Sequence, residues 1–270
     1  MTARSTALAA RIAATAFVAL VGLGALASCA AEPDAIHPTA PGPGPSVETK
    51  PAPTAEPEPE PTEQPAPPGF DKAALSLDDP NSIWVIVNKL RPLNPQNYIP
   101  TDLVTPNVHS TNGQPLRAVA AEATERMVAA AAADGVAIHI VSAYRSYDTQ
   151  VSVYGNFVAN QGQAFADTTS ARPGHSEHQT GLTADFAGND ACTLDECFID
   201  TAAGQWLNSR AAEFGFTMRY PNGLEGITGY HFEPWHYRYV GPELATELRA
   251  QGVNTLEEFF GLPAAGDYAG

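Results

Sequence analysis

The sequence predicts one α+β domain over residues 70–270, with a small antiparallel sheet and flanking helices. Three observations support this fold class. About 200 residues follow Phe70, which is enough for a single domain with a substantial core. Strand-like and helix-like stretches are intermixed without the regular strand–helix–strand spacing of a parallel sheet. The region also contains no internal repeat, which argues against a solenoid.

Helices are expected where apolar residues recur at helical spacing. The first runs from Leu116 to Asp134, is rich in alanine and stops at Gly135. Ser146 is expected to cap a second helix that continues to about Asn160, with Gly162 ending it. Three further helices are expected over residues 201–214, 242–250 and 256–260.

Strands are expected where β-branched and apolar residues alternate or cluster. A loop is expected over residues 165–181, which are rich in Ser, Thr, Gly and Pro. An irregular segment is expected over residues 92–106, which contain four prolines. Pro234 cannot donate a hydrogen bond to a neighbouring strand and is expected to interrupt the last strand. The five expected strands are residues 82–88, 136–143, 184–187, 216–220 and 230–240.

The N-terminal residues 1–28 are interpreted as a secretory signal, because Arg4 and Arg11 precede a short apolar run. Residues 26–29 (LASC) resemble the lipobox of bacterial lipoproteins. That resemblance implies cleavage before Cys29 and a diacylglycerol on its sulfur, which would anchor the chain outside the cytoplasm, on the outer face of the cell membrane. An ordinary signal peptide with an incidental cysteine is the alternative.

Residues 29–69 are expected to be a disordered tether. Residues 30–69 hold 13 of the 24 prolines, seven acidic residues and one lysine, with almost no aliphatic side chains. Such a segment cannot bury enough apolar surface to become ordered. In extended form it could hold a domain about 100 Å from the membrane, at ~3.1 Å per residue.

Charge and cysteine content exclude several kinds of partner and site. The domain has 23 acidic and 11 basic side chains, a net charge of −12, so no nucleic acid or anionic lipid surface is expected to bind it by charge. If Cys29 carries lipid, Cys192 and Cys197 remain, and outside the cytoplasm they are expected to form a disulfide. A zinc half-site would need a second cysteine pair.

Two segments combine histidines with carboxylates: SEHQTGLTAD (176–185) and HFEPWHYRY (231–239). In the first, a turn at Gly181 would let His178 and Asp185 point at one centre. In the second, an irregularity at Pro234 would bring Glu233 and His236 to the same side. Two imidazoles and a carboxylate suit zinc, and Glu233 is suited to take a proton from an attacking water. Spacing alone leaves His175 as a competing ligand.

Three segments closely resemble the signature segments of the zinc D-alanyl-D-alanine carboxypeptidases of the VanY type: SAYRSYDTQ (142–150), ARPGHSEHQTGLTAD (171–185) and TGYHFEPWHYRYVG (228–241). Residues 87–103 also resemble the N-terminal region of that family. The resemblance implies one zinc ion per chain, bound by His178, Asp185 and His236, with Glu233 as general base. It also implies the fold that this family shares with the hedgehog signalling domain.

The same resemblance implies that Arg145 and Ser176 hold the terminal carboxylate of a substrate and that Gln150 lines the pocket. A guanidinium can grip a carboxylate with two parallel hydrogen bonds. One departure is visible, because the family usually has GLA-x-D where this chain has a threonine at 183. We interpret Trp235, Tyr144 and Tyr237 as possible pocket residues.

The expected function is removal of the C-terminal D-alanine from peptidoglycan stem peptides by a monomeric enzyme. Pentapeptides and tetrapeptides both end in D-alanine, so the sequence leaves D,D- and L,D-carboxypeptidase activity open. An endopeptidase acting within the stem is a related alternative, but Arg145 favours a carboxy-terminal cut. A wall-binding module without catalysis is the second alternative, and the presence of Glu233 with all three ligands favours the enzyme.

Overall fold

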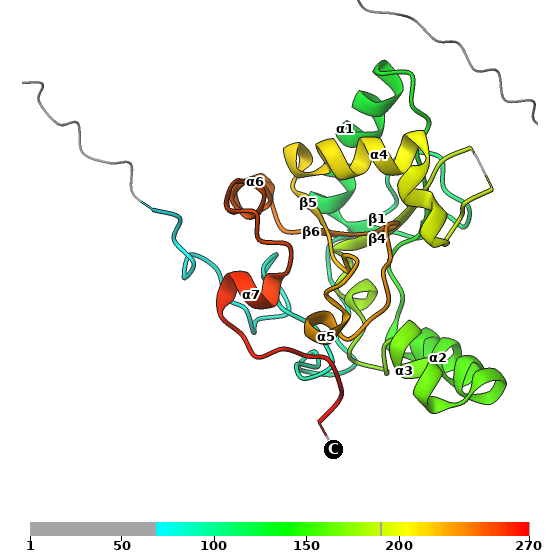
Figure 1. Ribbon diagram of the computed structural model, residues 1–270, viewed down its shortest axis with the longest axis vertical. Coiled ribbons are helices and arrows are strands. Elements are labelled where there is room, and N and C mark those ends of the chain that lie inside the picture. The colour runs from blue at the N-terminus through cyan, green and yellow to red at the C-terminus, as the bar shows by residue number, and fades with distance from the viewer. Residues whose placement is uncertain (1–68, 190, 270) are drawn as a thin grey trace, which may run out of the picture. The chain divides into compact units, whose positions relative to one another are not determined.

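A computed structural model describes residues 69–189 and 191–269 (Figure 1). The signal predicted over residues 1–28, the lipidation predicted at Cys29 and all but the last residue of the tether predicted over residues 29–69 therefore lie outside the described residues. In the two described ranges, no helix combines the length and apolar character that a membrane crossing requires.

The centre of the domain is a four-stranded sheet in the order β3-β4-β6-β5. Its strands are β3 (His139–Ser142), β4 (Thr183–Ala187), β6 (His236–Tyr239) and β5 (Phe216–Met218). All three neighbouring pairs are antiparallel, which confirms the predicted sheet. A separate two-stranded sheet pairs β1 (Leu103–Val104) with β2 (Leu116–Arg117).

The two faces of the sheet have different roles because side chains alternate along a strand. Phe186 on β4 and Tyr237 on β6 belong to the main hydrophobic core. Asp185 and His236, next to them in sequence, are direct partners across the β4–β6 pair and point to the opposite face. The apolar face thus anchors the strands, and the other face presents polar side chains.

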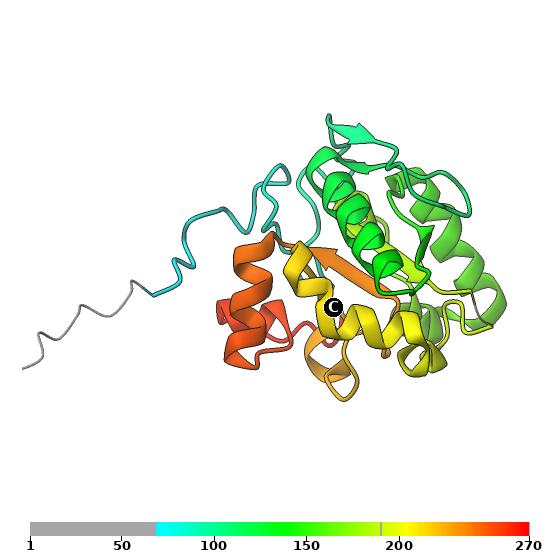
Figure 2. The ribbon, with the colours of Figure 1, turned by 90° about the horizontal axis from the view of Figure 1, so that it is seen from above.

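Figure 2 shows the ribbons of helices α1 (Ala118–Ala133) and α4 (Ala202–Arg210) from above. Both helices contribute to the same core, through residues such as Met127 and Leu207. A second cluster joins Trp84 to residues of α6 and α7. The remaining helices are α2 (Tyr147–Gln161), α3 (Gln163–Thr169), α5 (Glu225–Thr228), α6 (Pro242–Gln251) and α7 (Leu256–Phe260), with 3-10 turns at Glu177–Thr180, Glu196–Asp200 and Ala211–Phe214.

The predicted ends of α2 are confirmed. The first helix starts at Ala118 rather than at the predicted Leu116, because Leu116 and Arg117 form strand β2 and pair with β1. The Ser146 hydroxyl accepts a hydrogen bond from the backbone N–H of Thr149 at 3.2 Å and caps α2. Gly162 ends α2 with a φ of 84°, a conformation that side chains other than glycine disfavour. The helix expected over residues 201–214 consists of α4 followed by a 3-10 turn.

The strand predicted over residues 82–88 is wrong. This segment is buried but irregular, and only Asn88 forms an isolated bridge, to Arg91. The carbonyl oxygens of Ile83 and Val85 accept hydrogen bonds from the buried guanidinium of Arg238 instead of from a neighbouring strand. An apolar run indicates burial, but it does not determine which groups satisfy the backbone.

The loop predicted over residues 165–181 is wrong in part. Residues 163–169 form α3, which packs on α2, and the phenol of Tyr154 donates to Asp167 at 2.7 Å across that hairpin. The Ser and Thr content suggested a loop, but packing against α2 stabilises the helix. The expected strand over 230–240 is also shorter, because β6 starts only at His236.

Candidate active site

Three candidate metal ligands converge on the polar face of the sheet. His178 comes from the 3-10 turn before β4, Asp185 from the middle of β4 and His236 from the first position of β6. One ligand atom from each lies within 4.8 Å of the others, and all three residues are buried. Gly181, with a φ of 67°, provides the turn between His178 and Asp185 that the sequence suggested.

The ring orientations leave one nitrogen of each histidine facing Asp185. Nδ1 of His178 lies 2.7 Å from the Ala143 carbonyl oxygen, which can only accept, so Nδ1 carries the proton. Nε2 of His178 then faces Asp185 Oδ2 at 3.3 Å, and Nδ1 of His236 lies 3.0 Å from Asp185 Oδ1. Two imidazole nitrogens and one carboxylate oxygen fit a zinc ion with a fourth position free for water or substrate.

His175 does not join this group. Its Nδ1 donates to the carbonyl oxygen of Asn88 at 2.8 Å, and its ring packs edge-on against Tyr268. Of the two histidines that spacing left in competition, the structure places His178, and not His175, beside Asp185 and His236.

Glu233 lies beside the three ligands, with Oε2 3.5 Å from Nδ1 of His236. The backbone turns at Pro234, where the N–H of His236 donates to the carbonyl oxygen of Glu233 at 3.1 Å, so the irregularity expected there is confirmed. Burial, helped by the nearby Asp185 carboxylate, raises the pKa of Glu233 to about 7, against the opposing effect of His236. A carboxyl group with such a pKa can both accept and return a proton near neutral pH.

A cavity of about 250 Å³ opens over these residues, and Arg145 and Ser176 line it. Nη1 of Arg145 donates to Gln150 Oε1 at 3.0 Å, and Gln150 Nε2 donates to Ala171 O at 2.6 Å. Gln150 is fully buried and is not among the lining residues, so it supports Arg145 from behind. Within residues 69–189 and 191–269, no carboxylate forms an ion pair with Arg145, which leaves its charge available to a ligand.

The cavity has further walls that sequence reasoning did not identify. Phe157 comes from α2, Tyr220 packs against His236, and Tyr230 packs against Tyr220. Leu194 comes from the loop closed by the disulfide between Cys192 and Cys197. No local pattern marks these residues, because their approach to the cavity depends on the packing of distant segments.

The aromatic residues considered from the sequence have different positions. Trp235 lines the cavity, whereas Tyr237 is buried in the core on the other face of the sheet and Tyr144 does not line the cavity. The Cys192–Cys197 bond, expected from cysteine content, is present in the structure.

Comparisons with known proteins agree with this geometry. The family model of VanY, D-alanyl-D-alanine carboxypeptidase, matches residues 113–242. The putative carboxypeptidase YodJ of Bacillus subtilis (strain 168) is 40% identical over 191 residues, which cover 68% of this chain and 69% of that protein.

Two solved structures extend the comparison. The LD-carboxypeptidase LdcB, described with its peptidoglycan recognition, is 41% identical with a TM-score of 0.64, covering 67% of this chain and 87% of that one. A mutant of the vancomycin-resistance D,D-pentapeptidase VanY from a VanB-type cassette, in complex with Zn(II), is 33% identical with a TM-score of 0.56. It covers 66% of this chain and 98% of that one.

A small antiparallel sheet that presents two imidazoles and a carboxylate, with a second carboxylate of near-neutral pKa beside them, defines a metal-dependent hydrolase. The comparisons make the class specific. The chain belongs to the VanY family of D-alanyl-D-alanine carboxypeptidases and has the fold of its VanY and LdcB relatives.

Proposed function

We propose that this chain is a zinc carboxypeptidase that removes the C-terminal D-alanine from peptidoglycan stem peptides. The observation that carries the proposal is the guanidinium of Arg145. It lines the cavity that contains the candidate metal ligands, and it has no carboxylate partner among the residues that the structure describes. An unpaired cation at that place, in a domain with a net charge of −12, is suited to a substrate that ends in a carboxylate.

His178, Asp185 and His236 are the proposed zinc ligands. When bound, the zinc ion supplies Lewis-acid chemistry, polarising a scissile carbonyl and lowering the pKa of a water molecule. Glu233 accepts the proton of the attacking water at its carboxylate and returns it to the leaving amine of D-alanine. Arg145 and Ser176 bind the terminal carboxylate and thereby fix which peptide bond reaches Glu233.

The two activities known among the relatives leave the stem length open. LdcB is described as an LD-carboxypeptidase and the VanY mutant as a D,D-pentapeptidase. Both substrate types end in D-alanine, and Arg145 would grip the same carboxylate in each. The proposal therefore covers D,D- and L,D-carboxypeptidase activity.

The test compares Arg145→Ala with Arg126→Ala, whose arginine is exposed on α1 and pairs with Glu122. Each is assayed on one D-alanine-ended peptide as the free acid and as the C-terminal amide. Arg145→Ala should lower kcat/KM on the acid by about 100-fold, on the scale of two charge-assisted hydrogen bonds, and change it little on the amide. Equal losses on the acid and the amide would remove Arg145 from carboxylate recognition.

We further propose that the enzyme acts outside the cytoplasm as a monomer, held at the outer face of the membrane by lipid on Cys29 and a tether up to residue 69. The support is the lipobox-like sequence at residues 26–29 and the substrate of the proposed reaction, which lies in the wall. Mass spectrometry of the membrane fraction should find diacylglycerol on Cys29. A mature chain recovered unmodified from the medium would contradict the lipid anchor. Light scattering measures the molar mass in solution, which should be that of a single chain, and a mass of two chains would contradict the monomer.

A further inference from the structure

A buried cluster of charged side chains lies under the candidate site. Glu177, Arg219, Arg238 and Glu257 are each at most 1% exposed. Arg219 donates to Glu177 Oε1 through Nε at 2.9 Å. Its two Nη atoms donate to the Glu257 carboxylate at 2.9 and 2.5 Å. Arg238 Nη1 adds a hydrogen bond to Glu177 Oε1 at 3.0 Å. Removing four ions from water is costly, so a cluster of this kind calls for a reason beyond stability.

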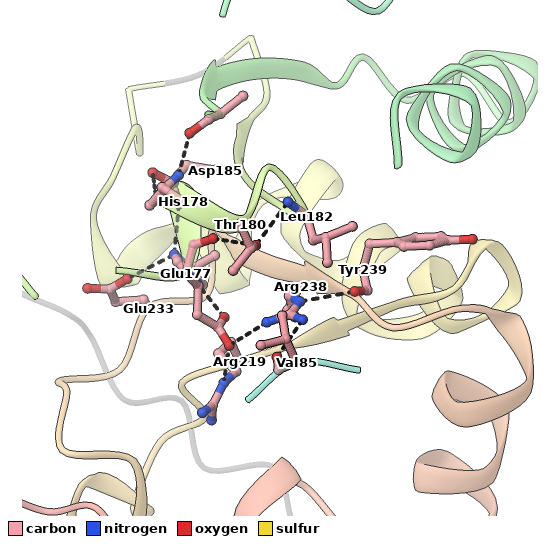
Figure 3. A network of polar contacts seen from close by, with 12 residues as sticks. Val85, Glu177, His178, Thr180, Leu182, Asp185, Arg219, Glu233, Arg238 and Tyr239 are labelled. Carbon is pink, nitrogen blue, oxygen red and sulfur yellow. Dashed lines mark hydrogen bonds and ion pairs between the residues drawn. The ribbon is translucent and has the colours of Figure 1, made fainter. Parts of the chain in front are cut away.

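The two oxygens of Glu177 have different surroundings (Figure 3). Oε1 accepts from both arginines, whereas Oε2 accepts no hydrogen bond from the described residues. Oε2 lies 3.5 Å from Nε2 of His236, and that nitrogen is the other buried atom at this place without a hydrogen-bond partner in the same residues. Two unsatisfied buried atoms, an acceptor and a ring nitrogen, thus face each other.

His236 therefore has carboxylates at both ring nitrogens. Nδ1 faces Asp185 and, at 3.5 Å, Glu233, whereas Nε2 faces Glu177. The ring also packs against Tyr220, with centroids 4.6 Å apart and the two ring planes tilted by 35°. An imidazole that binds a metal through one nitrogen commonly donates its other N–H to a carboxylate, which fixes the tautomer and the ring orientation.

We propose that Glu177 is a positioning residue that accepts the Nε2 proton of His236 and so keeps Nδ1 free to bind the metal. Arg219 and Arg238 hold the Glu177 carboxylate in place, and Glu257 on α7 holds Arg219. The inference rests on the proposed role of His236 as a zinc ligand. It assigns to the last helix, which lies beyond the family match at residues 113–242, a part in organising the metal site.

The test compares Glu177→Gln with Glu257→Gln. Each removes one buried carboxylate from Arg219, so both should lower the free energy of unfolding. Only Glu177→Gln changes the group that faces His236. Because both arginines donate to Oε1, the amide carbonyl must stay with them, and the amide NH₂ then meets the Nε2–H of His236, donor against donor.

Zinc affinity is measured by competition with a chelator on the purified chain, without substrate. Glu177→Gln should weaken binding about 10- to 100-fold, the usual effect of losing such a partner, and Glu257→Gln by less than about threefold. Equal weakening in the two variants, or no weakening in either, would overturn the proposal.

A measurement on the unmodified chain covers the case in which Glu177→Gln does not fold. Nitrogen NMR of the zinc-loaded, histidine-labelled protein should show His236 protonated at Nε2 and metal-bound at Nδ1. The reverse assignment would overturn the role of Glu177. Neither measurement uses turnover, so failure here leaves the carboxypeptidase proposal intact, and failure to release D-alanine leaves the zinc result intact.

Discussion

Replacing Glu233 by glutamine should remove catalysis and at the same time stabilise the metal-free fold. Burial raises the pKa of this carboxyl from its usual 4.5 to about 7. The folded state therefore binds the proton more tightly than the unfolded state, and stability falls as pH rises from about 4.5 to 7. At ~1.4 kcal/mol per unit, ionised Glu233 costs the fold on the order of 3 kcal/mol above pH 7.

The attraction between the charge of Glu233 and His236 is already included in this pKa, so the cost is a net value. We expect Glu233→Gln to raise the free energy of unfolding by roughly 1–3 kcal/mol at pH 8 and by nothing measurable at pH 4. Urea denaturation of the chelator-treated protein measures this. Glu122→Gln, an exposed helical change, is the control and should shift stability by no more than ~0.5 kcal/mol.

The same variant should lose at least about 100-fold in kcat, the usual contribution of a positioned general base. It should retain zinc, because Glu233 is not one of the three grouped ligands. Lower stability at pH 8 would refute the account of its burial. Unchanged turnover would refute its part in proton transfer.

Three further changes test other parts of the structure. Burial lowers the pKa of His236, but the carboxylates of Asp185 and Glu177 outweigh it and raise the pKa to about 9. Zinc must therefore displace a proton below that pH, and its measured affinity should rise about tenfold per pH unit between 6.5 and 8.5; a flat profile would contradict this. Thr183→Val removes a buried hydroxyl that has no hydrogen-bond partner among the described residues. Thermal unfolding should show that the free energy of unfolding rises by about 1 kcal/mol. A fall of that size would mean that the hydroxyl has a hydrogen-bond partner. Leu194 is 45% exposed at the cavity, so Leu194→Ala should raise KM for stem peptides a few-fold with kcat unchanged, and an unaltered KM would exclude it from substrate contact.

Patterns that act over a few residues predicted much of the fold. Ser146 as a helix cap and Gly162 as a helix end were correct because capping depends on adjacent backbone groups. Residues 82–88 were predicted as a strand because an apolar run indicates burial, yet their carbonyl groups bind the distant Arg238. Nothing within that segment could reveal such a partner.

The candidate site divides in the same way. Long signature segments identified His178, Asp185, Glu233 and His236, and the structure brings these four together. Glu177 lies in the same signature, but the sequence alone does not predict its role, since its partners are 42 and 61 residues away along the chain. A glutamate directly before a ligand histidine is a signal that becomes interpretable only when the buried arginines are known.

The most direct test of the proposed activity is to incubate the purified chain with tetrapeptide and pentapeptide stems, with and without a chelator, and to identify the products by mass spectrometry. The account predicts the loss of one D-alanine from the C-terminus of at least one stem, abolished by the chelator and restored by zinc. Cleavage inside the stem, or release of D-alanine that the chelator does not affect, would contradict it.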